Sequence, residues 1–242
     1  MYSIAFFWVG ETVSIPERLV SSIRLAMGKS VEVVQLTDQK TPKVLGISKI
    51  QRLDLSPDIM VARLEAYAQA RTSGEFTFFC DADSLFISPL DLKFRTGDIL
   101  IAERTADHLI NDRYPEFYPE FSGKMIKEVM PIMFGAIAVK GIQKVFFESL
   151  LEICLGLPER FHRWYGDQFS LASIITSTKF DFGFLDPQRH LFIVKSEVSL
   201  LELDLLKKSD VQMITFKGPD SKRHISSTLK NLRDLKIQSV VF

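Results

Sequence analysis

Segment 75–84 places two acidic residues at the abrupt end of an apolar run, and this arrangement narrows the possible folds. Residues 76–80, Phe-Thr-Phe-Phe-Cys, are apolar or β-prone, as expected for a short buried strand. Asp81 and Asp83 follow at once, separated by one residue. In an open α/β sheet, ligands bind beyond the carboxyl ends of the strands, where these carboxylates would lie. The segment therefore predicts an α/β fold with a ligand site at Asp81 and Asp83.

Two carboxylates at a strand end form a hard-oxygen site of the kind that suits Mg²⁺ or Mn²⁺. Such an ion takes one or two protein carboxylates, and substrate phosphates and water fill its remaining positions. We therefore predict that Asp81 and Asp83 bind a divalent cation. Through that cation they would hold a nucleotide diphosphate.

Three other interpretations of the acidic pair compete with a metal site. The carboxylates could cap a helix in a solvated turn. They could be the nucleophile and the general acid of a haloacid-dehalogenase-type phosphatase. That family carries its acidic pair near the N-terminus and needs a later acidic pair, which this sequence does not show. A regulatory phospho-acceptor aspartate would be expected on earlier strands.

The first half of the chain alternates between short apolar runs and helix-like segments. Strands are predicted at residues 4–9, 31–36, 50–55 and 99–102, and helices at residues 16–27 and 56–71. This βαβ rhythm predicts a mostly parallel, doubly wound central sheet flanked by helices.

Length and charge restrict the number of domains and the class of partner. At 242 residues the chain can bury the core of a single α/β domain. Apolar residues make up 46% of it, so we expect a globular protein. The chain has 30 Lys and Arg residues and 30 Asp and Glu residues. No overall electrostatic field therefore attracts nucleic acid or an anionic membrane.

The cysteines and the apolar start of the chain indicate the cellular compartment that we expect for the protein. Cys80 and Cys154 lie in apolar runs and are expected to be buried thiols, as in a reducing cytoplasm. Residues 1–10 lack a basic start and a clear cleavage site, so we interpret them as a strand and not as a signal peptide. No apolar run reaches membrane-spanning length. We therefore predict a cytoplasmic protein.

The second half contains a long loop and a strand interrupted by glycine. Residues 107–121 combine two prolines with aromatic and charged residues, which is typical of a functional loop or lid. The alternative is a loop whose aromatic side chains pack on the core. Residues 130–140 form an apolar strand around Gly135, where a ligand or another backbone is expected to approach closely. A helix is predicted at residues 142–155.

Asp167 and Gln168 open an apolar helix of period 3.6. A helix start aims backbone N–H groups and polar side chains into a site. Asp167 could instead be only the N-cap of that helix.

A strand at residues 211–216 leads into a basic turn that contains Lys217, Gly218 and Lys222. A basic C-terminal helix is predicted at residues 221–238. A strand end, a glycine turn and cations together form an anion-binding geometry. The competing interpretation of these cations is a solvated surface.

In this order the motifs resemble those of the GT-A glycosyltransferases that use nucleotide sugars, particularly the retaining enzymes of glycosyltransferase family 8 and their bacterial relatives. Those enzymes have a strand ending in Asp-x-Asp, a strand with a small-residue turn, a helix opening in Asp-Gln and a late His-x-x-Gly-x-x-Lys turn. The matching segments are residues 76–83, 133–139, 164–171 and 213–223. The resemblance covers about residues 1–225.

The resemblance implies a GT-A-like fold and a metal-dependent transfer of a hexose, with retention, from a UDP-sugar to a glycan, lipid-linked or protein acceptor. The nucleotide-binding half would be about residues 1–105, and the acceptor and sugar half about residues 106–225. Because Gln168 is a poor nucleophile, a front-face transfer without a covalent intermediate is expected. Two alternatives stay open, a nucleotide-sugar-binding protein without transferase activity and the phosphatase.

The resemblance also implies roles for individual residues. Asp81 and Asp83 would anchor the metal and the diphosphate. Gln168 would lie beneath the anomeric carbon, and Asp167 would hold the sugar hydroxyls. These two residues are the predicted catalytic pair.

Three further residues are assigned to the donor by their positions. Arg63, on the helix before the acidic strand, would be the basic residue near the donor. Val9 and Asp38 end the first two strands, where the nucleoside would rest. Residues 134–136, Phe-Gly-Ala, replace the polar turn of the family, which removes an expected sugar contact.

The late turn departs from the family pattern. Thr215 stands where the family has a metal-binding histidine, so we expect water or His224 to complete the metal shell. The lysine after Gly218 is displaced by one residue, so Lys217 or Lys222 would take its role at the diphosphate.

Overall fold

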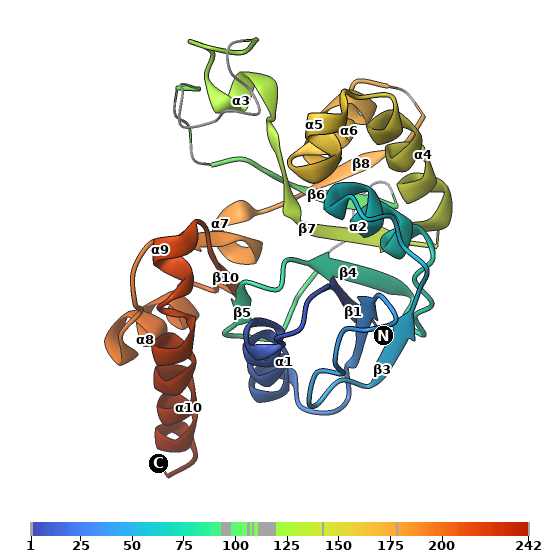
Figure 1. Cartoon of the computed structure of the whole chain (residues 1–242). Helices are drawn as coiled ribbons and strands as arrows, with labels where there is room; N and C mark the ends of the chain where they lie inside the picture. Colours follow the sequence, from blue (N-terminus) through green and yellow to red (C-terminus); the bar gives the residue numbers. More distant parts are fainter. Residues whose placement is uncertain are drawn as a thin grey trace.

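The computed structural model describes residues 2–92, 98–105, 107, 109–110, 120–141, 143–177 and 179–241. These residues form a large central sheet, a small second sheet and helices that cover both (Figure 1).

The central sheet has, in the described part of the chain, seven strands in the order β3-β2-β1-β4-β7-β6-β8. Their bounds are Tyr2–Phe7 (β1), Glu32–Thr37 (β2), Lys49–Arg52 (β3), Phe76–Cys80 (β4), Ile99–Glu103 (β6), Ile132–Lys140 (β7) and Phe182–Leu185 (β8). Neighbouring strands run parallel except at β7, which is antiparallel to β4 and β6. The predicted mostly parallel sheet is confirmed, and β1, β2 and β4 end at one edge.

A second sheet brings the acidic pair and the basic turn together. It has the order β5-β10-β9, with bounds Ser84–Phe86 (β5), Phe192–Val194 (β9) and Met213–Phe216 (β10). β5 starts directly after Asp83 and runs antiparallel to β10, pairing Ser84 with Thr215. This register puts the residues after β10 beside those before β5.

Helices cover both faces of the central sheet. Their bounds are Ser14–Met27 (α1), Ile59–Ala68 (α2), Ile126–Val129 (α3), Gln143–Leu155 (α4), Glu159–Arg163 (α5), Gly166–Ile175 (α6), Pro187–His190 (α7), Leu200–Lys208 (α8), Pro219–Lys222 (α9) and Ile225–Val241 (α10). α2, α4, α5 and α6 gather on one face and α1 lies on the other (Figure 1). α8 and α10 pack on the small sheet.

The inner strands of the central sheet, such as β4 and β7, are buried on both sides. In β7, Phe134 and Ile137 pack in one cluster with α2 and α4, whereas Met133 and Ala136 pack in the cluster that contains α1. Side chains along a strand point alternately to the two faces, so a doubly covered strand needs apolar residues at nearly every position. This explains why the runs in β4 and β7 are almost continuous.

The structure corrects two predicted boundaries in the first half. β3 ends at Arg52, before the predicted end at residue 55, and α2 spans Ile59–Ala68 where residues 56–71 were expected. Leu53 and Leu55 pack against the core from the connection between these elements. Their apolar character therefore reflects burial of a loop and not a longer strand.

The predicted basic helix at residues 221–238 is wrong at its start. α9 ends at Lys222, and the long helix α10 starts only at Ile225. The Ser221 hydroxyl donates to the carbonyls of Lys217 and Gly218, which closes α9 as a separate turn. The cations of the basic turn therefore do not lie at the start of a long helix.

The loop predicted at residues 107–121 falls largely outside the described residues, which omit 111–119. At its two ends, Ile110 and Phe121 pack against Ile126 and Phe161 in a small apolar cluster. The role of this loop as a lid stays a prediction.

Cys80 and Cys154 are buried free thiols, as predicted. In the described ranges no helix combines the length and the apolar composition that crossing a membrane requires. The cytoplasmic location stays a prediction.

Candidate functional site

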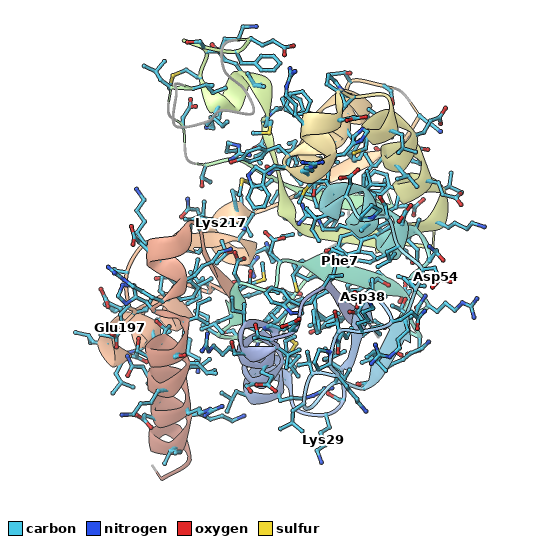
Figure 2. All side chains as sticks on the ribbon, viewed as in Figure 1. Phe7, Lys29, Asp38, Asp54, Glu197 and Lys217 are labelled. Carbon is cyan, nitrogen blue, oxygen red and sulfur yellow. The ribbon has the colours of Figure 1, made fainter. Side chains whose placement is uncertain are left out.

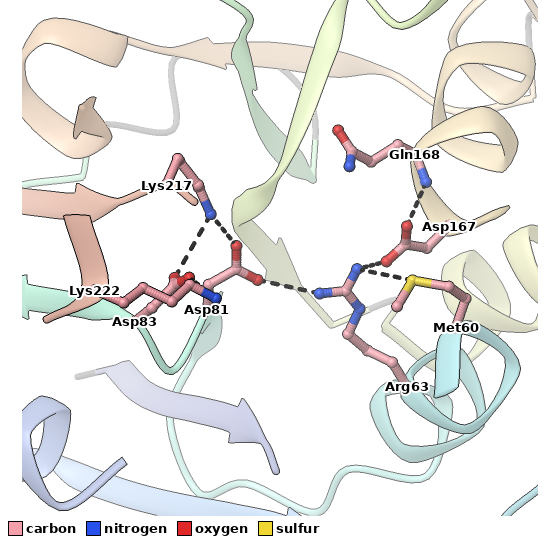
Figure 3. Close-up of polar contacts among 8 residues, drawn as sticks. All are labelled: Met60, Arg63, Asp81, Asp83, Asp167, Gln168, Lys217 and Lys222. Carbon is pink, nitrogen blue, oxygen red and sulfur yellow. Dashed lines mark hydrogen bonds and ion pairs between the residues drawn. The ribbon is translucent and has the colours of Figure 1, made fainter. Parts of the chain in front are cut away.

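Asp81 lies directly after β4, at the edge where the parallel strands end. Its backbone N–H donates to the Gly135 carbonyl at 3.2 Å, which ties it to β7. Oδ1 accepts a hydrogen bond from Arg63 Nη1 at 3.1 Å, and Oδ2 pairs with Lys217 Nζ (Figure 3). Since its side chain is only 19% exposed, Asp81 is a half-buried carboxylate between two cations and not a solvated helix cap.

At Gly135, where a ligand or another backbone was expected, the structure shows a close approach by two side chains. A Cβ atom at this position would lie 2.8 Å from Asp81 Oδ2 and 3.3 Å from Lys217 Nζ. β7 can pass behind this ion pair only because residue 135 has no side chain.

Asp83 sits in the turn between β4 and β5, with its side chain 11% exposed. Its Oδ2 lies 2.9 Å from Lys222 Nζ, and its Oδ1 lies 3.6 Å from Lys217 Nζ. The Phe216 N–H donates to the Asp83 carbonyl at 3.1 Å, which continues the β5–β10 ladder by one residue. The strand pairing therefore delivers Lys217 to the acidic pair.

Lys217 contacts both carboxylates of the acidic pair (Figure 3). Burial alone raises the pKa of Asp81, but Lys217 and Arg63 outweigh it and lower that pKa to about 2. Burial alone lowers the pKa of Lys217, but Asp81 and Asp83 outweigh it and raise that pKa. The acid and the ammonium are therefore both charged at neutral pH.

Arg63 reaches from α2 to two carboxylates that belong to different elements. Its Nη1 bonds Asp81, and its Nη2 pairs with Asp167 Oδ2 (Figure 3). The guanidinium also lies over the Phe134 ring, 4.7 Å from its centroid. This places the predicted basic residue near the acidic pair and fixes it from three sides.

Asp167 is fully buried in the first turn of α6. The N-cap of this helix is Tyr165, in the left-handed region at φ 67°, so the alternative that Asp167 is the N-cap is wrong. Asp167 Oδ1 accepts the Gln168 N–H at 2.7 Å, while Oδ2 pairs with Arg63. The carboxylate therefore joins the start of α6 to the acidic pair through one arginine.

Gln168 is held by a residue that the sequence did not single out. Arg104 Nη2 donates to Gln168 Oε1 at 2.6 Å, and Arg104 Nε donates to the Met130 carbonyl at 2.7 Å. Because arginine has only donors, the amide oxygen must face Arg104, and the amide NH₂ group is left for another partner. Gln168 is thus arranged to donate a hydrogen bond.

Val9 and Asp38 lie at the ends of the first two strands, as predicted. Figure 2 shows Phe7 and Asp38 on the side of the sheet where β1 and β2 end, with Lys29 at the opposite end of β2. Asp38 Oδ1 accepts the Thr41 N–H at 2.8 Å and the Lys40 N–H at 3.2 Å, so it shapes a turn. Among the described residues, no hydrogen bond or ion pair joins Val9 or Asp38 to Asp81 or Asp83.

His224 is not brought to the acidic pair. Its Nε2 lies 3.4 Å from Arg223 Nε, in the break between α9 and α10. In the part of the chain that the structure describes, no group of three or more His, Cys, Asp or Glu side chains is arranged to hold a metal. The predicted set of Asp81, Asp83 and His224 is therefore not assembled.

The donor set around the acidic pair fits a divalent cation poorly. Asp81 and Asp83 supply carboxylates, but Lys217 lies between them and Lys222 holds the outer oxygen of Asp83. The predicted dependence on Mn²⁺ or Mg²⁺ stays a prediction, and we assign no step to a metal.

A cavity of about 740 Å³ lies elsewhere, between α1 and α10, and none of the site residues lines it. The candidate site is thus defined by its ion pairs at the strand ends and not by the volume of a closed pocket.

Comparison with solved structures identifies the fold. The chain aligns over 98% of its length, and over 95% of the other chain, with an active-site mutant of LgtC in which glutamine is replaced by glutamate, at a TM-score of 0.59 and 12% identity. The galactosyltransferase LgtC in complex with donor and acceptor sugar analogs aligns over the same shares at a TM-score of 0.57 and 12% identity. The chain has a glycosyltransferase fold.

The glycosyltransferase GlyE of Streptococcus pneumoniae shares this fold, at a TM-score of 0.58 and 11% identity. The alignment covers 98% of the present chain and 64% of GlyE. By sequence, no protein-family model and no curated protein matches the chain. The glycosyltransferase fold thus comes from the three-dimensional structure, and it agrees with the GT-A-like fold that the motifs predicted.

Proposed function

We propose that this protein is a glycosyltransferase that transfers a hexose from a UDP-sugar to a glycan, with retention of configuration. The observation that carries the proposal is the Arg63 bridge between Asp81 and Asp167. It joins the strand end where a diphosphate would bind to the helix start where a sugar would lie, in a glycosyltransferase fold.

The bond-breaking step builds negative charge on the leaving phosphate oxygen while the sugar becomes oxocarbenium-like. Lys217, Lys222 and Arg63 are cations at the strand ends and would stabilise that charge. They are fixed by carboxylates before the donor arrives, so little reorganisation is needed during the reaction. This is electrostatic stabilisation by a preorganised site.

Gln168 and Asp167 would act at the sugar. Gln168 presents an amide NH₂ group and is not a nucleophile, which favours a front-face transfer without a covalent intermediate. Asp167 uses both carboxylate oxygens inside the protein, so its role is to fix Arg63 and the start of α6. A direct bond from Asp167 to the sugar hydroxyls stays a prediction.

A glycan acceptor is favoured by the solved complex of LgtC with donor and acceptor sugar analogs, which has the same fold. Lipid-linked and protein acceptors stay open as sources of the accepting hydroxyl. The phosphatase alternative loses support because the chain has a glycosyltransferase fold.

The test is a thermal-shift screen of nucleotide sugars, followed by an assay for release of the nucleoside diphosphate from the best donor. A ligand at 100 times its dissociation constant stabilises a protein by about 2.7 kcal/mol, which is readily detected. Binding with turnover supports a transferase, whereas binding without turnover supports the alternative of a nucleotide-sugar-binding protein. Failure of every nucleotide sugar to bind would contradict both.

A further inference from the structure

Lys217 occupies the position that a divalent cation shared by Asp81 and Asp83 would need. Its Nζ pairs with Asp81 Oδ2 and lies 3.6 Å from Asp83 Oδ1, so one ammonium group faces both carboxylates (Figure 3). A metal bound by both carboxylates would have to displace this ammonium group, which is held in place by the β5–β10 pairing.

The carboxylate oxygens are already in use. Asp81 Oδ1 bonds Arg63, Asp81 Oδ2 bonds Lys217, and Asp83 Oδ2 pairs with Lys222 at 2.9 Å. Asp83 Oδ1 is the exception, since it is buried without a hydrogen bond among the described residues. Its nearest cation is again Lys217. A metal held by both carboxylates would therefore have to displace cations from the other three oxygens.

The residues around the pair offer little to complete a metal shell. Thr215 pairs with Ser84 in the ladder, and both side chains are fully buried. Neutral hydroxyl groups are weak ligands compared with the carboxylates that usually hold these ions. The residues around the pair therefore fit a metal poorly, both because their side chains are weak ligands and because Lys217 fills the space.

We infer that Lys217 and Lys222 take the place of a divalent cation, so that the site binds a nucleoside diphosphate through ammonium groups and without metal. The inference rests on the proposed function. Asp81 and Asp83 are then positioning residues, which orient the ammonium groups toward the donor.

The hydrogen-bond inventory of the two lysines supports this role. An ammonium group carries three N–H donors. Lys217 meets two carboxylates and Lys222 meets one, so each retains donor capacity that a phosphate oxygen can take up. The side chains of Lys217 and Lys222 are 30% and 39% exposed, so a ligand from solvent can reach both side chains.

The experiment measures UDP binding by isothermal titration calorimetry, once in excess EDTA and once with Mn²⁺. Free Mn²⁺ is followed separately by its electron paramagnetic resonance signal. We expect the wild-type protein to bind UDP with the same affinity in both buffers and to leave the Mn²⁺ signal unchanged in the absence of UDP.

The decisive variant is Lys217→Met, which keeps much of the stem and removes the charge. It should weaken UDP binding in EDTA about tenfold or more, because one charge-assisted hydrogen bond to the diphosphate is lost. Because the two carboxylates then lack their shared cation, the variant should also gain Mn²⁺ binding. Lys222→Met should weaken UDP binding without that gain.

Lys140→Met is the matched control. Lys140 pairs with Glu75 at 3.0 Å, at the other end of β7. The variant therefore loses one ion pair that lies away from the site. Its UDP affinity should equal that of the wild type. Melting temperatures of all variants without ligand show whether each one folds.

The outcomes separate the inference from the proposed function. UDP binding by the wild type that disappears in EDTA and returns with Mn²⁺ overturns the inference and leaves a metal-dependent glycosyltransferase. Unchanged UDP binding by folded Lys217→Met in EDTA overturns the inference as well. Absence of binding by any nucleoside diphosphate in either buffer overturns the proposed function, and the inference with it.

Discussion

Arg63 holds two half-buried or buried carboxylates that reach it from opposite sides, Asp81 after β4 and Asp167 at the start of α6. Its position one helix before the acidic strand was predicted, but its bridging role was not. Sequence shows which residue types lie near a strand end. It does not show that one guanidinium spans the two halves of a site.

The first prediction concerns Asp167→Asn. The change removes the charge that balances Arg63 at a position with no solvent exposure. Breaking a buried ion pair from one side should lower the free energy of unfolding by about 3 kcal/mol, measured by urea denaturation. Asp204→Asn is the control, because Asp204 forms an exposed pair with Lys208. This change should lower the free energy of unfolding by less than about 0.5 kcal/mol. Equal costs for both changes would contradict the bridge.

The second prediction concerns Gln168→Ala. If the Gln168 amide stabilises the reacting sugar, turnover of the nucleotide sugar should fall about 100-fold, as for loss of one preorganised donor. Affinity for UDP and the melting temperature should change little, because the amide lies away from the diphosphate end. A variant with normal turnover would show that Gln168 serves only to hold Arg104.

The sequence could identify the reactive side chains but not all of their partners. Asp81, Asp83 and Lys217 could be found because acidic and basic residues follow apolar runs, and strand ends share an edge. Arg104 carried the same signal, because it directly follows the apolar strand β6, but the sequence did not show its partner. The packing of α6 against the sheet brings Gln168 to it.

At the scale of elements, β7 shapes the site through one glycine. Gly135 allows the strand to pass beside the Asp81–Lys217 pair. The third prediction is that Gly135→Ala displaces this pair, costs about 1–3 kcal/mol of stability and weakens UDP binding. Calorimetry and thermal melting on one preparation measure both effects.

Gly156→Ala is the control for that change. A Cβ atom there would meet the Ile153 carbonyl at 3.4 Å, which is ordinary contact, and Gly156 lies after α4, away from the acidic pair. UDP affinity that falls equally in both variants would mean that the loss has no connection with Asp81.

Long, strongly patterned elements were predictable, whereas short ones were not. The buried strands β4 and β7 have almost continuous apolar runs, and β1 and β2 are mostly apolar, so all four were predictable from the sequence. β5 spans only Ser84–Phe86 and has no period of its own, because its partner β10 lies far along the chain. The break between α9 and α10 was also missed, because α9 spans only Pro219–Lys222 and is too short to show a helical period.

At the scale of the whole molecule, the fold protects both thiols. Cys80 and Cys154 lie in the two clusters on opposite faces of the central sheet, and burial raises the pKa of each thiol. The fourth prediction is that neither reacts with an aromatic disulfide reagent until urea unfolds the protein. Rapid labelling of both thiols in the native state would mean that this packing is wrong.

The overall architecture followed from the sequence because its rhythm of strands and helices allows few arrangements. The antiparallel course of β7 was not predicted, since apolar pattern carries no information on strand direction. That reversal matters for function, because it places Gly135 beside Asp81.

The most direct test of the central claim is a crystal structure of the protein with a UDP-sugar that resists hydrolysis. The account predicts the diphosphate at Lys217 and Lys222, and the sugar between Arg63 and the Gln168 amide. It predicts the uridine at the ends of β1 and β2. A nucleotide bound away from the acidic pair, with Lys217 and Arg63 still paired to Asp81, would contradict it.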